Sequence, residues 1–143
     1  MKRLLIVLTL TISIAACGGS SSSETTFETS NDVLAAMTAA GLSCTGYTPT
    51  AKADREMGQE SANEVGGCEL DGESIAITLW KDSGQRKNWE GMGKTIGCKM
   101  GEAFGITEFD YLNGGTWSIS GTSKTLTEKL ATKIGGDAIH IKC

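Results

Sequence analysis

The sequence of 143 residues contains one histidine and one proline, and only 6% of its residues are aromatic. Any catalytic arrangement that needs an imidazole would have to use His140, which lies near the end of the chain where apolar and polar residues alternate. No Cys-x-x-Cys spacing is present, so the pattern indicates no zinc site and no other metal or cofactor. We therefore expect no catalytic residue, and we expect His140 to lie on the surface.

The sequence also lacks an apolar run long enough to cross a bilayer as a resident helix, which needs about 20 residues. Its longest run, residues 4–14, follows Lys2 and Arg3 and precedes two alanines and Cys17. A basic start, a short apolar core and small residues at the cleavage site are typical of a secretory signal peptide. This pattern predicts a signal peptide over residues 1–16.

The four residues Ile14-Ala15-Ala16-Cys17 resemble the lipobox of bacterial lipoproteins, in which Leu is commonest where Ile14 stands. In that family the cysteine thiol receives a diacylglyceryl group, and cleavage makes this cysteine the first residue. The resemblance implies lipidation of Cys17 and a lipid-anchored location on the extracytoplasmic face of the cell membrane. Residues 17–30 would then form a flexible tether rich in Gly and Ser. The alternatives are an ordinary cleaved signal and an N-terminal core segment with a chance cysteine.

Basic side chains are fewer than acidic ones, 13 against 17. Loss of Lys2 and Arg3 with the signal peptide would widen the difference. An acidic exported protein binds nucleic acid poorly, because the negative phosphate backbone repels it. We therefore expect the membrane, through the lipid on Cys17, to be a partner, and we expect no nucleic-acid partner.

The chain has five cysteines, and lipidation of Cys17 would leave four. An even set in an exported domain predicts two disulfides, for which three connectivities exist. We favour Cys44–Cys68, which would tie the end of the first predicted helix to a hairpin. The second bridge, Cys98–Cys143, would then hold the C-terminal strand. A crossed connectivity and reduced thiols are the alternatives.

The clearest local signal is a β-hairpin over residues 68–80, with an Asp-Gly turn at residues 71–72. Side chains alternate along a strand, so one face of the hairpin would be the core face. Its members are Cys68, Leu70, Ile75, Ile77 and Leu79. Thr78 and Trp80 lie on the other face, where they would form a recognition patch unless a helix or loop covers them.

Apolar periodicity and turn residues predict the remaining elements. Helices are expected over residues 31–40, 84–96 and 124–134, and strands over residues 104–112, 116–120 and 138–143. The polar segment 46–67 is expected to be a long surface loop. Together these elements predict a single α+β domain over residues 31–143. In this two-layer sandwich, about three helices cover one face of a mostly antiparallel sheet that two disulfides stabilise.

Several short motifs are distributed along the predicted domain. They are Ala-Ala-Gly-Leu-Ser-Cys after the first helix, Gly-Cys before an Ile-rich strand, a Trp-bearing second helix, Gly-Gly-Thr-Trp-Ser-Ile and a helix that ends in Gly-Gly. With these motifs the chain resembles small actinobacterial lipoproteins of unknown function. That resemblance implies no catalytic residue.

These patterns favour a membrane-anchored, non-enzymatic binding module outside the cytoplasm. Its partner would be an envelope protein, a cell-wall component or a small molecule, bound by the loop at residues 46–67 or by the outer face of the hairpin. One alternative is a small cell-envelope hydrolase that uses the carboxylates near the hairpin, namely Glu69, Asp71, Glu73 and Asp82. The other is a structural envelope protein without a specific ligand.

Overall fold

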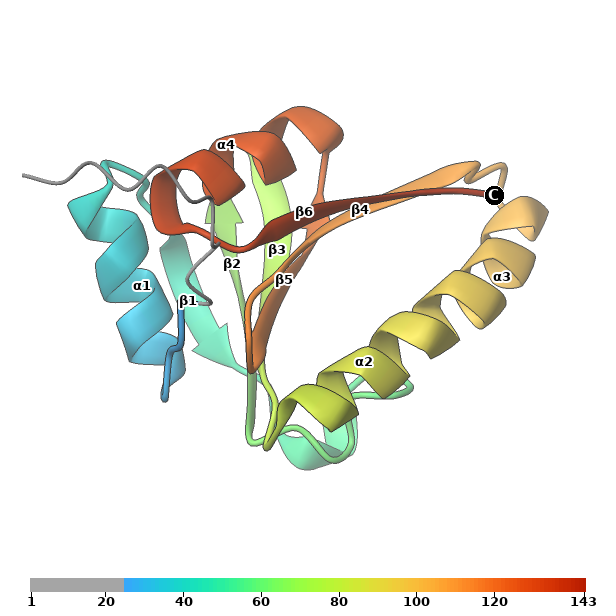
Figure 1. Ribbon diagram of the computed structural model, residues 1–143, viewed down its shortest axis with the longest axis horizontal. Helices are drawn as coiled ribbons and strands as arrows, with labels where there is room; N and C mark the ends of the chain where they lie inside the picture. Colours follow the sequence, from blue (N-terminus) through green and yellow to red (C-terminus); the bar gives the residue numbers. More distant parts are fainter. Residues whose placement is uncertain (1–24) are drawn as a thin grey trace, which may run out of the picture.

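The computed structural model describes residues 25–143 (Figure 1), so the predicted signal peptide, Cys17 and most of the tether lie outside the described residues. Six strands form one sheet in the order β1-β2-β3-β5-β4-β6, and every pair of neighbours is antiparallel. The strands are β1 (Thr45–Pro49), β2 (Glu64–Leu70), β3 (Glu73–Leu79), β4 (Glu108–Asn113), β5 (Trp117–Thr122) and β6 (Asp137–Lys142). Together with the helices described below, this sheet confirms the predicted α+β fold class.

Two helices, α1 (Ser30–Ala39) and α4 (Lys124–Ile134), pack on one face of the sheet (Figure 1). The third is a continuous helical rod made of α2 (Ser83–Met92), a π-helical segment (Gly93–Gly97) and α3 (Cys98–Ala103). We call this rod the arm. Figure 1 shows it on the other side of the sheet from α1, so the prediction that all helices lie on one face is wrong. The reason is that β4 carries large side chains on both faces, with Leu112 in the main core and Phe109 and Tyr111 facing the arm, so each face needs a cover.

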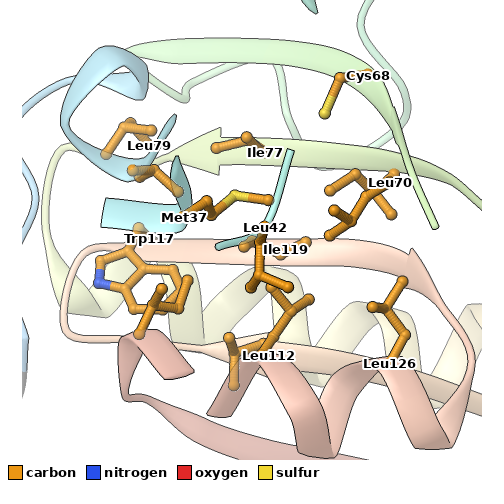
Figure 2. Close-up of a cluster of buried hydrophobic side chains, with 14 residues drawn as sticks. Met37, Leu42, Cys68, Leu70, Ile77, Leu79, Leu112, Trp117, Ile119 and Leu126 are labelled. Atoms are coloured by element: carbon orange, nitrogen blue, oxygen red, sulfur yellow. The ribbon is translucent and has the colours of Figure 1, made fainter. Parts of the chain in front are cut away.

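The main core lies between the sheet and helices α1 and α4 (Figure 2). Each strand of the β2–β3 hairpin turns its predicted apolar face toward this core, and Leu70 and Ile77 are fully buried there. The turn residues Asp71 and Gly72 both have positive φ, of 52° and 84°, which suits the twist of a two-residue hairpin turn. The remaining core side chains include Val33, Met37, Leu42, Leu79, Leu112, Trp117, Ile119, Leu126 and Leu130.

The predicted first and last helices are confirmed almost to the residue. The Thr29 side chain accepts a hydrogen bond from the Asp32 amide, and the Asp32 carboxylate accepts one from the Thr29 amide, which together close a capping box. The Thr29 hydroxyl and then the Thr29 amide donate hydrogen bonds to the Asp32 carboxylate, and these bonds lower the pKa of that carboxyl. At the other end of the chain, Ser123 caps α4, which spans the predicted residues 124–134.

The expected long loop over residues 46–67 is wrong at both ends. Residues 45–49 form β1, and β2 begins at Glu64, so the loop is shortened to residues 50–63. Two adjacent glycines and polar neighbours made the start of β2 resemble a loop. Gly66 lies within β2, and the Tyr47 ring occupies the space that a Cβ atom at this position would need. A glycine is therefore required here inside the strand.

The predicted end of the second helix at Gly97 is also wrong. Gly97 has helical dihedral angles, φ −58° and ψ −44°, and the rod continues to Ala103. The strand predicted from residue 104 begins only at Glu108, and Phe104 is 80% exposed. A glycine permits a chain reversal but does not require one, which is why its presence misled the prediction.

Both predicted disulfides are present. Cys44–Cys68 joins the segment after α1 to β2, with 5.6 Å between the Cα atoms. Cys98–Cys143 joins the start of α3 to the residue after β6, with 5.2 Å between the Cα atoms. The second bridge therefore holds the C-terminal strand, as predicted, and it also fixes the outer part of the arm to the sheet.

The end of the predicted tether belongs to the folded domain. The Trp117 indole N–H donates a hydrogen bond of 2.7 Å to the Thr25 carbonyl, and the Phe27 ring lies 5.1 Å from the Trp117 ring between centroids. Residues 25–30 are thus part of the domain that the sequence predicted to begin at residue 31, because Trp117 needs a partner for its buried N–H.

The close approach of Gly114 to Trp117 gives a test of this packing. A Cβ atom at Gly114 would overlap the Trp117 indole, whereas no atom lies within 4 Å of a Cβ atom at helical Gly91. We expect Gly114→Ala to lower the free energy of unfolding by about 2 kcal/mol. The control Gly91→Ala should raise it by up to about 1 kcal/mol, because alanine favours helix. Urea unfolding of the oxidised protein measures both changes, and equal effects at the two positions would contradict the packing.

Candidate functional site

The recognition patch predicted at Thr78 and Trp80 is not on the surface. Thr78 is 0% exposed and Trp80 is 2% exposed. The Gln59 amide donates a hydrogen bond of 3.2 Å to the Thr78 hydroxyl, and the Trp80 indole N–H donates one of 3.0 Å to the Ser118 hydroxyl. The prediction of an exposed patch is therefore wrong, and the alternative that a loop or helix covers these residues is confirmed.

Two segments cover this part of the sheet. Residues 50–63 contribute Gln59 and Ala62, and the arm contributes Trp89, whose ring lies 5.4 Å from the Trp80 ring between centroids. The Trp89 ring also contacts Tyr111 of β4 edge-on, with 5.4 Å between centroids. This row of aromatic rings attaches the first half of the arm to the sheet.

A second attachment holds the other half of the arm. The Cys98–Cys143 disulfide fixes the start of α3 covalently, and the Phe109 ring of β4 lies against Gly97 and Gly101. A Cβ atom at Gly101 would come within 2.9 Å of the Phe109 Cζ atom. The arm is thus attached to the sheet at two points that are about two to three turns of helix apart.

Between the arm and the sheet lies a cavity of about 420 Å³, which we call the groove. This volume lies within the usual range of small-molecule sites, about 300–1,000 Å³. Its wall is mostly apolar, with side chains from the arm, from β4 and β6, and from the loop before β2. They include Met57, Trp89, Met92, Ile96, Met100, Phe109, Tyr111 and Ile141.

Several of these apolar side chains are exposed to solvent. Met57 is 65% exposed and Met100 is 56% exposed, and Met92 and Ile96 are exposed by more than a third. Exposed apolar side chains that gather around one cavity indicate a binding surface, whereas scattered ones do not. Methionine suits such a surface, because its flexible thioether adapts to ligands of different shape.

Sequence reasoning missed the groove, although a signal for it was present. Gly93, Gly97 and Gly101 are spaced four apart, so they lie on one face of the arm. Gly93 and Gly97 line the groove, and Gly101 lies against Phe109. Each glycine weakens a helix by up to about 1 kcal/mol. When several share one face, they keep that face free of side chains, and this indicates that another part of the protein or a ligand lies close to it.

The polar part of the groove wall is built around Glu90. Its carboxylate accepts hydrogen bonds from the Arg86 guanidinium at 3.3 Å and from the Asn113 amide at 3.1 Å. Arg86 also donates to the Gly115 carbonyl at 3.1 Å. This network connects α2 to the β4–β5 hairpin and neutralises the charge of Glu90.

Tyr111 lies beside this network. It is 6% exposed, and its hydroxyl group lies beside the Glu90 carboxylate. Burial, together with the negative charge of the nearby Glu90, raises the pKa of the Tyr111 phenol. The phenol therefore stays neutral around pH 7 and keeps a hydrogen to donate.

A second hollow, of about 540 Å³, adjoins the groove, since Glu90, Tyr111 and Ile141 line both. It opens between the arm and the edge strand β6, and its wall includes Lys87 and Lys94. We call this opening the lysine mouth. In the part of the chain that the structure describes, neither lysine forms an ion pair.

The carboxylates of the predicted hydrolase alternative do not converge. Asp71 pairs with Lys129 at 2.5 Å, and the Glu73 carboxylate accepts hydrogen bonds from the backbone and side chain of Ser123. Asp82 caps α2, and Glu69 is exposed on the second strand of the sheet. Each of the first three thus has a local structural role.

His140 is exposed, as predicted, and its Nδ1 atom pairs with Asp110 on the neighbouring strand. Its Nε2 atom lies 3.7 Å from Glu128 of α4. Within residues 25–143, no group of three His, Cys, Asp or Glu side chains is placed to hold a metal ion. Of the helices in the same residues, none has the length and apolarity needed to cross a membrane.

Comparisons with known proteins identified no relative of this chain. No family model, no curated protein and no solved structure matches the chain. The groove and its lining residues are therefore the basis for a functional proposal.

Proposed function

We propose that this chain is a membrane-anchored, extracytoplasmic lipoprotein that acts as a non-enzymatic binding module. The lipid would be attached to Cys17, and the binding site would be the groove. The ligand would be a largely apolar molecule from the cell envelope.

One observation carries the binding part of this proposal. A cavity of about 420 Å³ with a methionine-rich and aromatic wall lies between a sheet and a helical arm that is attached at two points. Apolar wall exposed to water is costly, at about 25 cal/mol for each Å². A ligand that covers this wall recovers that free energy, and the covalent attachment keeps the site open in its absence.

The proposed anchor fits this ligand class. A molecule that prefers the bilayer reaches water at very low concentration, so a binding module that is tethered beside the membrane meets it far more often than a freely diffusing one. The two disulfides also agree with an oxidising location outside the cytoplasm.

The anchor is tested by changing the cysteine of the lipobox-like sequence. We expect Cys17→Ser to release the protein from the membrane fraction or to leave its signal peptide uncleaved, because the lipid attachment site is lost. Cell fractionation and intact mass measure both outcomes, with Ser22→Ala in the tether as the control that stays anchored. A Cys17→Ser protein with the parent's mass and membrane content would contradict the proposal.

The groove is tested by photolabelling the full chain in lipid nanodiscs with an uncharged long-chain alkyl diazirine. We expect labels on peptides that carry Met92, Ile96 and Met100, because these side chains line the groove. A charged side chain in an apolar site is costly. Met100→Lys should therefore reduce the labelling severalfold.

The matched control is Phe104→Lys, which places the same charge near the end of the same rod but outside the groove. This variant should be labelled like the parent. Equal loss in both variants, or labels spread evenly over the protein surface, would contradict binding in the groove.

A further inference from the structure

We propose that Met57, Met92 and Met100 form a site of methionine oxidation, at which a peroxide converts their thioethers to sulfoxides and weakens the binding of the apolar ligand. This inference rests on the proposed function, and it adds a way in which the groove is regulated. It follows from where the methionines lie, from how exposed they are and from the state of the other sulfur atoms.

The methionines of the described residues fall into two groups. Met57, Met92 and Met100 line the groove, and each is exposed by more than a third. Met37 is 0% exposed and packs in the main core. The oxidation of a thioether by a peroxide follows the access of the oxidant to the sulfur atom. A peroxide therefore reaches the groove methionines and not the core methionine.

The cysteines of the domain do not compete for the oxidant. Within residues 25–143, all four are joined in the disulfides Cys44–Cys68 and Cys98–Cys143. Peroxides react with a cysteine through its thiolate, and a disulfide has none. The exposed thioethers around the groove are therefore the sulfur atoms of this domain that a peroxide oxidises first.

The oxidation needs no group from the protein. The thioether sulfur attacks one oxygen of hydrogen peroxide, so that an S–O bond forms and the O–O bond breaks. The hydrogen on the transferred oxygen passes to the departing hydroxide, which leaves as water. The sulfur loses two electrons and the peroxide gains two. An apolar side chain thereby becomes a polar sulfoxide.

The three methionines are distributed along the groove. Met57 comes from the loop before β2, and Met92 and Met100 come from the arm, where eight residues separate them by about 12 Å along the helix axis. Each sulfoxide oxygen accepts hydrogen bonds, and an uncharged alkyl ligand has no donor for it. A ligand that covers these oxygens removes their water without replacing it, which is costly. Oxidation therefore opposes ligand binding from the loop and from the arm.

The test uses the full chain in nanodiscs, treated with hydrogen peroxide and then with catalase before it is photolabelled with the alkyl diazirine. Peptide masses report oxidation at each methionine, and the label reports binding in the groove. We expect the gain of an oxygen atom at Met57, Met92 and Met100 and none at Met37, because only the first three are exposed. Labelling of the groove should fall severalfold.

The matched control is the triple variant Met57→Leu/Met92→Leu/Met100→Leu, which keeps an apolar wall of similar volume but has no thioether in it. It should be labelled like the parent before peroxide treatment and keep its label afterwards. Equal oxidation of Met37, or an equal loss of label in the parent and the triple variant, would overturn the inference. A parent that keeps its label after oxidation would also overturn it but leave the proposed function standing, whereas a parent groove that takes up no label before oxidation would contradict both.

Discussion

The covalent bond between Cys98 and Cys143 is the constraint on which the second face of this sheet depends. The arm carries few large apolar side chains, and its outer half meets the sheet mainly through Gly97 and Gly101 on the Phe109 ring. Such a contact alone stabilises little. The disulfide closes a loop of 45 residues, which in the loop-closure model is worth about 4 kcal/mol. It keeps the arm beside the sheet without requiring the space between them to be filled.

The two faces of the sheet therefore have different roles. The face under α1 and α4 is filled by a continuous set of buried side chains, with Trp117 and Leu130 fully excluded from water. The opposite face is closed near β3 by the Trp80–Trp89 pair, but remains open between the arm and β4. Dense packing on the first face supplies stability, so the second face can carry exposed methionines and a buried phenol beside the Glu90 carboxylate. This division of roles is common in binding proteins, where a rigid scaffold supports an incompletely packed site.

Local signals in the sequence were sufficient for much of the fold and insufficient for the site. The Asp71-Gly72 turn, the helix at residues 124–134 and the alternation in the hairpin depend on near neighbours, and all were predicted. The burial of Trp80 depends on Ser118 and on Ala62 of the loop at residues 50–63, and no local pattern encodes these contacts. Gly97 was interpreted as a helix end because its partner, Phe109, comes from a strand later in the chain. The groove depends on the position of the arm along the sheet, which the contacts of Trp89 with Tyr111 and of Gly101 with Phe109 define together with the disulfide, and no local pattern encodes these contacts.

The central claim is that the arm contacts the sheet at two places and spans the groove between them. Nuclear Overhauser effects in the oxidised protein test it most directly. The structure predicts cross-peaks between the Phe109 ring and the Gly101 α-protons, and between the Trp89 and Tyr111 rings. Cross-peaks at Trp89 and Tyr111 without any between Phe109 and Gly101 would mean that the outer half of the arm is not held against the sheet, and would contradict the account.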